Sequence, residues 1–155
     1  MVASPELQRA AEGLAMVLTD NGLQRMTARV LAMLLFTEQS SVTMGELSET
    51  LSASAGAISG ALKMLTSVGL AERVPAPASR RDHYRLRDNA WAILFTSQNG
   101  TIAAMQAAAD AGIDAAEEGS PARQRLSQMR DFYAFLTAEI PALLDRWAQQ
   151  QRPGG

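Results

Sequence analysis

The apolar residues in the middle of the chain are spaced as in two short helices. In the first, Met44–Leu51, the leucines lie four positions apart and therefore share one face. In the second, residues 55–68, spacings of four, three and three separate Ile58, Leu62, Leu65 and Val68. Ser54 can cap the start of this second helix, and Gly69 can end it. Two amphipathic helices joined by so short a turn predict a helix-turn-helix, whose second helix can enter a DNA major groove.

The next segment predicts a hairpin. Residues 70–74 and 82–87 can each run as a strand, and the prolines within residues 75–81 prevent regular pairing there, so that stretch forms the tip. One face of the second strand would carry Tyr84 and Leu86, and the other would carry His83, Arg85 and Arg87. A helix-turn-helix followed by a basic-tipped hairpin is a winged helix. The predicted fold class is therefore mainly α with a small β-hairpin.

Further helices are predicted before this core. Ser4–Pro5–Glu6 has the cap, proline and acid of a helix start, and Asn21–Gly22 can end that helix. A densely apolar helix over residues 27–38 follows. Thr43 and Glu46 can then form a capping box for the next helix.

Helices are also predicted after the hairpin. One ends near Gly112 and has Asn99–Gly100 inside it, and a last helix begins at Ser120–Pro121. Pro141 should kink or split this last helix, because proline lacks a backbone donor and clashes with the preceding turn. Residues 149–155 are expected to fray.

The terminal helices carry more apolar surface than the core can cover, which predicts a two-fold homodimer with interlocked helices. The predicted organisation is an N-terminal dimerisation helix (1–21), a winged helix-turn-helix core (22–88), C-terminal dimerisation helices (89–150) and a disordered tail (151–155). Such a dimer would present its recognition helices to palindromic half-sites about 10 bp apart.

Composition excludes several kinds of chemistry. The 155 residues include no cysteine, which excludes disulfides and thiolate metal sites, and His83 is the only histidine, so we expect no metal or other cofactor. No nucleophile motif, phosphate loop or paired-carboxylate motif is present, so we expect no enzyme. The longest apolar run, Val30–Phe36, is seven residues, too short to span a membrane. A cytoplasmic protein without a membrane partner is the expectation.

Charge is unevenly divided along the chain. The net charge is −2, but residues 63–87 hold six basic and two acidic side chains, so the remainder carries −6. A basic hairpin on an acidic body directs attraction for nucleic acid to one surface. The arginines could alternatively be only the solvated face of a strand.

The predicted DNA contacts come from the start of the first helix, from the second helix and its preceding turn, and from the hairpin. They are Thr43, Ser54, Ala55, Gly56, Ser59, Lys63, Arg80, Arg81, His83 and Arg85. The helix face is small and weakly charged, so it can lie close to DNA but has few long side chains to read bases. Capping and ordinary surface polarity are alternatives for the serines. Arg85 and Arg87 can contact the DNA backbone or instead hold Asp82 or Asp88.

A small-molecule effector is a further possible partner. Met26, Met33, Trp91 and Phe95 are candidates for a pocket lining, because methionine and aromatic side chains shape adaptable apolar cavities. Plain core packing is the preferred interpretation of these four residues.

Four stretches, residues 45–48, 54–65, 68–73 and 79–85, resemble the DNA-binding core of MarR-type regulators. The Arg-Arg-Asp-His-Tyr run of the wing and Trp91 are most similar to the GbsR-like subgroup. The resemblance covers about residues 22–95 and implies a homodimeric winged-helix transcriptional regulator, usually a repressor and often released by a small ligand. Many members carry an aspartate two residues before a wing arginine, whereas Asp82 here follows both Arg80 and Arg81.

Together these patterns predict a sequence-specific DNA-binding transcriptional regulator, a dimeric repressor that binds a palindromic operator. The alternative is a winged helix that serves as a protein-interaction module without sequence-specific DNA binding. The small recognition-helix face and the net acidity of the chain keep this alternative open, but the DNA-binding regulator is the preferred interpretation.

Overall fold

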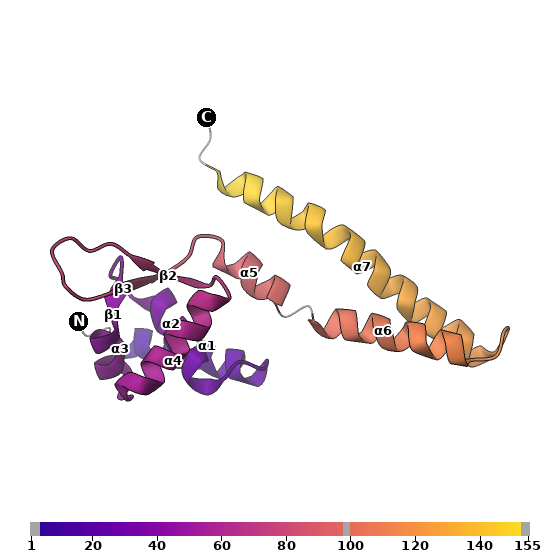
Figure 1. Cartoon of the computed structure of the whole chain (residues 1–155), viewed down its shortest axis with the longest axis horizontal. Coiled ribbons are helices and arrows are strands. Elements are labelled where there is room, and N and C mark those ends of the chain that lie inside the picture. The colour runs from indigo at the N-terminus through magenta and orange to yellow at the C-terminus, as the bar shows by residue number, and fades with distance from the viewer. Residues whose placement is uncertain (1–3, 98–99, 153–155) are drawn as a thin grey trace. The chain divides into compact units, whose positions relative to one another are not determined.

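The computed structural model describes residues 4–97 and 100–152 (Figure 1). The chain divides into two compact units, Met1–Ile93 and Leu94–Gly155. The described part of the first unit contains, in order, α1 (Pro5–Asp20), α2 (Arg25–Phe36), β1 (Val42–Thr43), α3 (Met44–Leu51), α4 (Ala55–Ser67), β2 (Ala71–Val74) and β3 (His83–Leu86). This is the predicted winged helix, with α3 and α4 as the helix-turn-helix.

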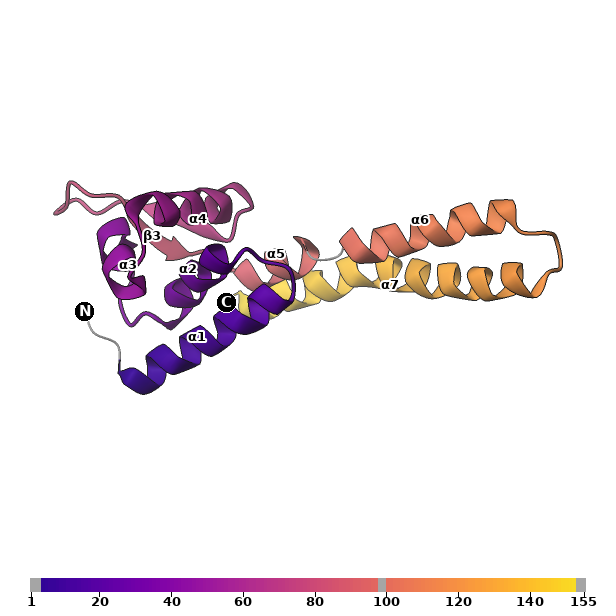
Figure 2. The same ribbon diagram turned by 90° about the horizontal axis from the view of Figure 1, so that it is seen from below.

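Helix α2 is the centre of the first unit. It packs against α1 on one side and against α4 on another, and the α1–α2 pair is seen from below in Figure 2. The largest fully buried side chains are Val30, Leu31, Leu47, Ile58, Leu62 and Leu65. Val68, which the apolar spacing assigns to the buried stripe of α4, is 42% exposed because the helix ends at Ser67 and Val68 is its C-cap.

The predicted helix starts are confirmed. The Ser4 hydroxyl accepts a hydrogen bond from the Leu7 amide, and the Ser54 hydroxyl accepts one from the Ala57 amide. At the start of α3 the capping box is complete. Helix α2 runs over Arg25–Phe36 instead of the predicted residues 27–38, so that its ends lie two residues earlier.

The sheet has three strands, not the two of the predicted hairpin. The strand order is β1-β3-β2, and all pairs are antiparallel. β1 is only two residues long, and its residues Val42 and Thr43 pair with Tyr84 and His83. The sequence does not predict this strand, because two residues are too few to show a strand pattern. The base of the wing is thereby joined to the segment that leads into α3.

The second unit contains two long helices. Helix α5 (Ala90–Ser97) crosses the boundary between the units, and α6 (Gly100–Ala115) and α7 (Pro121–Gln151) follow it. The structure describes the predicted helix that ends near Gly112 as α5 and α6, on either side of residues 98–99, and α6 continues past Gly112 to Ala115. The Asn99–Gly100 pair, which the sequence places inside this helix, falls partly on Asn99, which lies outside the described residues.

The last helix begins as predicted, with the Ser120 hydroxyl accepting a hydrogen bond from the Arg123 amide. It is not split at Pro141, which lies inside a continuous helix. The fraying predicted for the C-terminal end is wrong through Gln151, which is still helical, and residues 153–155 of the predicted tail lie outside the described residues.

Helices α6 and α7 pack against each other. The packing is tight at Gly112, where an added Cβ would lie 2.7 Å from Leu126 Cδ1. No described helix is long and apolar enough to cross a membrane.

The capping box at the start of α3 generates a stability prediction. The Thr43 hydroxyl accepts a hydrogen bond from the Glu46 amide at 3.2 Å, and the Glu46 carboxylate accepts one from the Thr43 amide at 2.8 Å. Thr43→Ala removes the first bond and should lower the free energy of unfolding by about 1 kcal/mol, measured by chemical denaturation. Glu49→Ala, on an exposed position of the same helix, should change it by less than about 0.5 kcal/mol. Equal stabilities of the two variants would contradict the cap.

Candidate nucleic-acid interface

Helix α4 has one fully buried side and one open side. Ile58, Leu62 and Leu65 are at most 2% exposed. The opposite side, which we name the recognition face, consists of exposed residues: Ala55, Gly56, Ser59, Gly60 and Lys63. Lys63 has no ion pair within the described chain, so its charge is available to an external partner.

Two glycines of the recognition face have no structural need to be glycine. A Cβ added at Gly56 or Gly60 would meet nothing within 4 Å, and neither residue has a positive φ. Glycine inside a helix costs about 1 kcal/mol relative to alanine. The helix therefore gives up stability at these positions and leaves its backbone open to close approach.

The polar residues around α4 differ in their availability. The Ser54 hydroxyl caps the helix at 3.1 Å from the Ala57 amide, but the residue is exposed and its proton remains free to be donated. Ser59 is also exposed. Thr43, predicted as a DNA contact, is only 6% exposed and its hydroxyl is engaged by the Glu46 amide. Thr43 is therefore placed to cap α3, and its burial argues against a direct contact with DNA.

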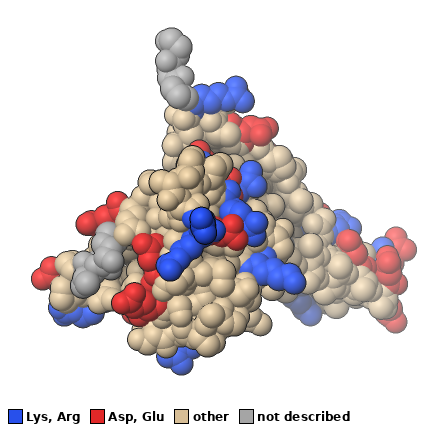
Figure 3. Space-filling view, turned by 60° about the vertical axis from the view of Figure 1, so that its left-hand side comes forward, with Lys and Arg blue, Asp and Glu red and all other residues tan. Residues whose placement is uncertain are grey.

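The wing tip carries two free cations. Arg80 and Arg81 are exposed, and neither forms an ion pair with any residue that the structure describes. The Arg81 side chain reaches back toward the start of α3, where its Nη1 atom lies 3.7 Å from the place of a Cβ on Gly45. Figure 3, in which the side of the wing comes forward, shows basic side chains gathered around acidic ones.

The arginines of the strands are neutralised by partners other than those predicted. The Glu72 carboxylate forms one ion pair with Arg85 at 2.7 Å and another with Arg87 at 3.8 Å. The predicted partners, Asp82 and Asp88, are wrong for these two arginines. Glu72 and Arg85 face each other across the strands, and the register of the sheet thus sets the pairing.

Asp82 instead holds Arg73, to which sequence reasoning assigned no role. The Arg73 Nη2 atom lies 3.7 Å from an Asp82 carboxylate oxygen, and its guanidinium carbon lies 5.9 Å from the centre of the Tyr84 ring. A hydrogen bond with Tyr84, followed by the charge of Asp82, raises the pKa of Arg73 above its ordinary value. Because Arg73 pairs with Tyr84 and side chains alternate along a strand, Arg73 shares the face of Tyr84 and lies opposite to Arg85. That alternation was a usable signal in the sequence.

His83 is half-buried at the base of the wing. Its Nδ1 atom lies 3.1 Å from the Ser41 hydroxyl, and its Nε2 atom is buried without a hydrogen-bond partner among the described residues. The ring thus ties β3 to the segment before β1, and this placement argues against a direct DNA contact. Among the residues that the structure describes, no three His, Cys, Asp or Glu side chains gather closely enough to hold a metal ion.

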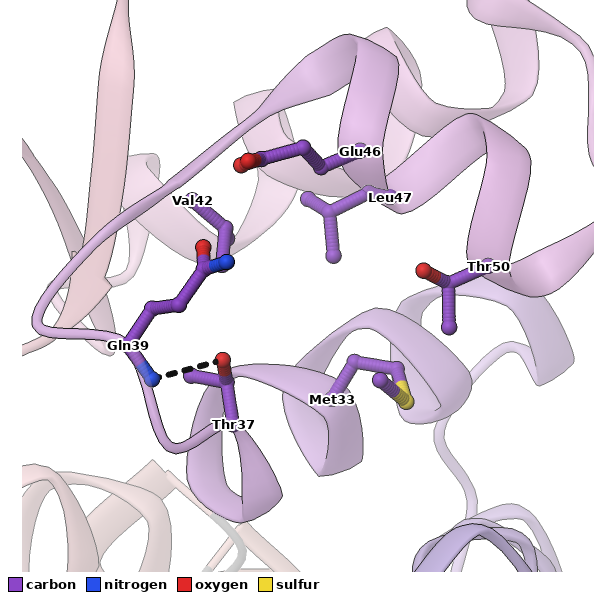
Figure 4. Close-up of a pocket in the computed structure, with 7 residues that line it drawn as sticks. All are labelled: Met33, Thr37, Gln39, Val42, Glu46, Leu47 and Thr50. Carbon is purple, nitrogen blue, oxygen red and sulfur yellow. Dashed lines mark hydrogen bonds between the residues drawn. The ribbon is translucent and has the colours of Figure 1, made fainter. Parts of the chain in front are cut away.

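Of the four candidate ligand residues, Met33 borders cavities that the structure describes in the first unit. Met33 lines a cavity of about 30 Å³ between α2 and α3, with Leu47 and Thr50 across from it (Figure 4). This volume is small, on the scale of one or two water molecules. Met33 also borders an open hollow of about 730 Å³ beside α1. Met26 lines neither space, and Trp91 and Phe95, which lie four positions apart on α5, are 41% and 46% exposed.

Comparisons with known proteins cover nearly the whole chain. Residues 21–82 match the model of the MarR family, and residues 89–150 match that of the MmpR5-like MarR family transcriptional regulators. The chain is 32% identical over 151 residues to the HTH-type transcriptional regulator MmpR5 of Mycobacterium tuberculosis (strain ATCC 25618 / H37Rv), covering 97% of this chain and 92% of that relative. It is similar to a crystal structure of a transcriptional regulator, with 32% identity, a TM-score of 0.69 and coverage of 94% of this chain and 99% of the other.

The expected resemblance to the GbsR-like subgroup is not confirmed, because the C-terminal match is to the MmpR5-like model. The match at family level is extensive, and it includes the helix-turn-helix whose recognition face and wing are described above. The chain therefore belongs to the MarR family and is a DNA-binding transcriptional regulator with a winged helix-turn-helix.

Proposed function

We propose that this regulator is a cytoplasmic homodimeric repressor that binds a palindromic operator. One observation carries the proposal: the recognition face and the unpaired wing arginines Arg80 and Arg81 lie in the same compact unit, and both are exposed. Helix α4 enters the major groove, and the wing tip reaches the adjacent minor groove or its phosphates.

The contacts divide by chemistry. Ser54, Ser59 and Lys63 are exposed and bind phosphates or base edges, while Ala55 and Gly56 allow the helix to come close to the bases. The remaining predicted contact residues have structural roles and do not bind DNA directly. Thr43 fixes the start of α3, His83 fixes the base of the wing, and Arg85 is held by Glu72.

The need for a dimer is supported by the second unit. Among its described residues, only Ala109 and Ile113 are buried, and no residue of α7 is. Large apolar side chains of α7 remain exposed, including Phe132, Phe135, Leu143 and Trp147. An exposed apolar surface of this kind marks an interaction site, and a second copy of the chain supplies a matching surface by symmetry. A small ligand that alters the spacing of the two recognition helices would release the DNA, and a coupling of about 1–3 kcal/mol would suffice.

The first test is binding to DNA from upstream of the protein's own operon at two salt concentrations, followed by fluorescence anisotropy. Arg81→Ala should weaken binding to all sequences and reduce the slope of log K against log salt by about 0.9 for each DNA phosphate that is no longer neutralised. Arg9→Ala removes an equal charge from exposed α1 and should leave the slope unchanged. If wild-type binding showed neither salt sensitivity nor sequence dependence, the protein-interaction module would be favoured.

The second test addresses the close approach of α4. Gly60→Ala should raise the free energy of unfolding by about 1 kcal/mol, because the position is an open helix interior. The same variant should bind the operator more weakly, with little change in binding to unrelated DNA. Gly13→Ala on α1, where an added Cβ also meets nothing within 4 Å, serves as the control for stability without an effect on DNA. Unchanged operator affinity in Gly60→Ala would show that the backbone of α4 does not approach the bases closely.

The third test addresses the dimer. Phe135 is 62% exposed on α7, and Phe135→Glu places a charge on the apolar surface. Sedimentation analysis should show a dissociation constant raised at least about tenfold, since truncation of a central aromatic contact costs about 2 kcal/mol or more. Gln128→Glu adds the same charge at an exposed polar position of α7 and should leave the dimer intact. A wild-type monomer at micromolar concentration would refute the proposed assembly.

A further inference from the structure

A hollow of about 250 Å³ lies between α4 and the sheet within the first unit. Its lining includes Ser59, Lys63 and Thr66 from α4, Arg73 and Tyr84 from the sheet, and Met44 from the start of α3. Three of these residues, Ser59, Lys63 and Arg73, are exposed and can donate hydrogen bonds. The hollow is therefore a partly basic recess beside the recognition face.

The two cations of the hollow are available to an anion. Lys63 has no ion pair within the described chain. Arg73 is paired with Asp82, but the side chains are 64% and 56% exposed and the atoms are 3.7 Å apart, so the pair is weak. The ring of Tyr84 beneath the guanidinium and the carboxylate of Asp82 at its side restrict its direction. Arg73 is thus oriented without being neutralised by a close partner.

Arg73 also differs from Arg85 and Arg87 because its side chain lies on the other face of the sheet. Arg85 lies on the opposite face, and both Arg85 and Arg87 are held by Glu72. Arg73 shares its face with buried Tyr84, and its guanidinium lines the same hollow as Lys63 of α4. A planar guanidinium can bind two phosphate oxygens at once, and a lysine ammonium adds a point charge.

The position of the hollow matches a feature of duplex DNA. A helix in the major groove and a wing in the next minor groove are separated by one sugar–phosphate strand, which must pass the junction of helix and wing. We propose, resting on the proposed function, that this hollow is a seat for one backbone phosphate of the operator in each subunit. Arg73 and Lys63 are its cationic ligands, and Ser59 donates a hydrogen bond.

The test uses the full-length protein and operator DNA in which single phosphates are replaced by neutral methylphosphonates. In the wild type, one position in each half-site should lower affinity about tenfold, because a charge-assisted hydrogen bond is lost there. Arg73→Ala should lower the affinity for unmodified DNA to a similar extent, and methylphosphonate at that same position should weaken its binding little further. Its salt slope should fall by about 0.9 for each subunit, whereas that of the Arg9→Ala control should not. Arg73→Gln, with a matching thermal unfolding curve, provides a second variant that keeps the length of the side chain.

Three outcomes would overturn the seat. The first is that the wild type binds the operator specifically, but the methylphosphonate substitution lowers the affinity of the wild type and of Arg73→Ala equally at every position. The second is Arg73-dependent binding of inorganic phosphate to the protein alone, at constant ionic strength, with operator affinity unaffected by Arg73→Ala. That result would assign the hollow to a free anion. The third is a wild type that binds no DNA specifically, which would remove the proposed function together with the seat.

Discussion

The burial of the Ile58, Leu62 and Leu65 side of α4 is the constraint on which the rest of the structure depends. These side chains are at most 2% exposed, and α4 packs through this side against α2. Burying each such side chain contributes about 1.5–3 kcal/mol, so rotation of α4 about its axis would be strongly opposed. Because the helix cannot turn, the small residues on its other side always face outward. The hydrophobic core thereby determines which part of the backbone a DNA groove can meet.

The two units meet the requirement for a core in different ways. The first unit has a continuous interior around α2, with Leu31 and Leu47 almost fully enclosed. The second unit consists of long helices that pack tightly at Gly112, and most of its large side chains remain in contact with solvent. A helical pair of this kind has too little interior of its own. We infer that DNA recognition resides in the self-sufficient unit, while the other unit takes its stability from association.

Features set by neighbours in the sequence could be predicted, and features set by distant partners could not. The sequence predicts the helix starts at Ser4, Thr43, Ser54 and Ser120, because a cap is defined within three residues. Strand β1 was missed, because only its pairing with residues some 40 positions away makes it a strand. The ion-pair partners of Arg85 and Arg87 were wrong for the same reason, since strand register places Glu72 beside them. The sequence predicts a kink or split of α7 at Pro141, yet the helix is continuous there.

Glu72 has a consequence for how such a protein would find its operator in a genome. A carboxylate that neutralises two arginines on the outer face of the sheet reduces the attraction of the molecule for arbitrary sequences. A low affinity for non-specific DNA shortens the residence time at each wrong site. Because a genome offers very many competing sites, the ratio of specific to non-specific binding determines how often the operator is occupied. Replacement of Glu72 by a neutral residue during evolution would make the protein adhere more firmly to chromosomal DNA while slowing its search. One acidic side chain on the sheet would in this way contribute to regulatory accuracy.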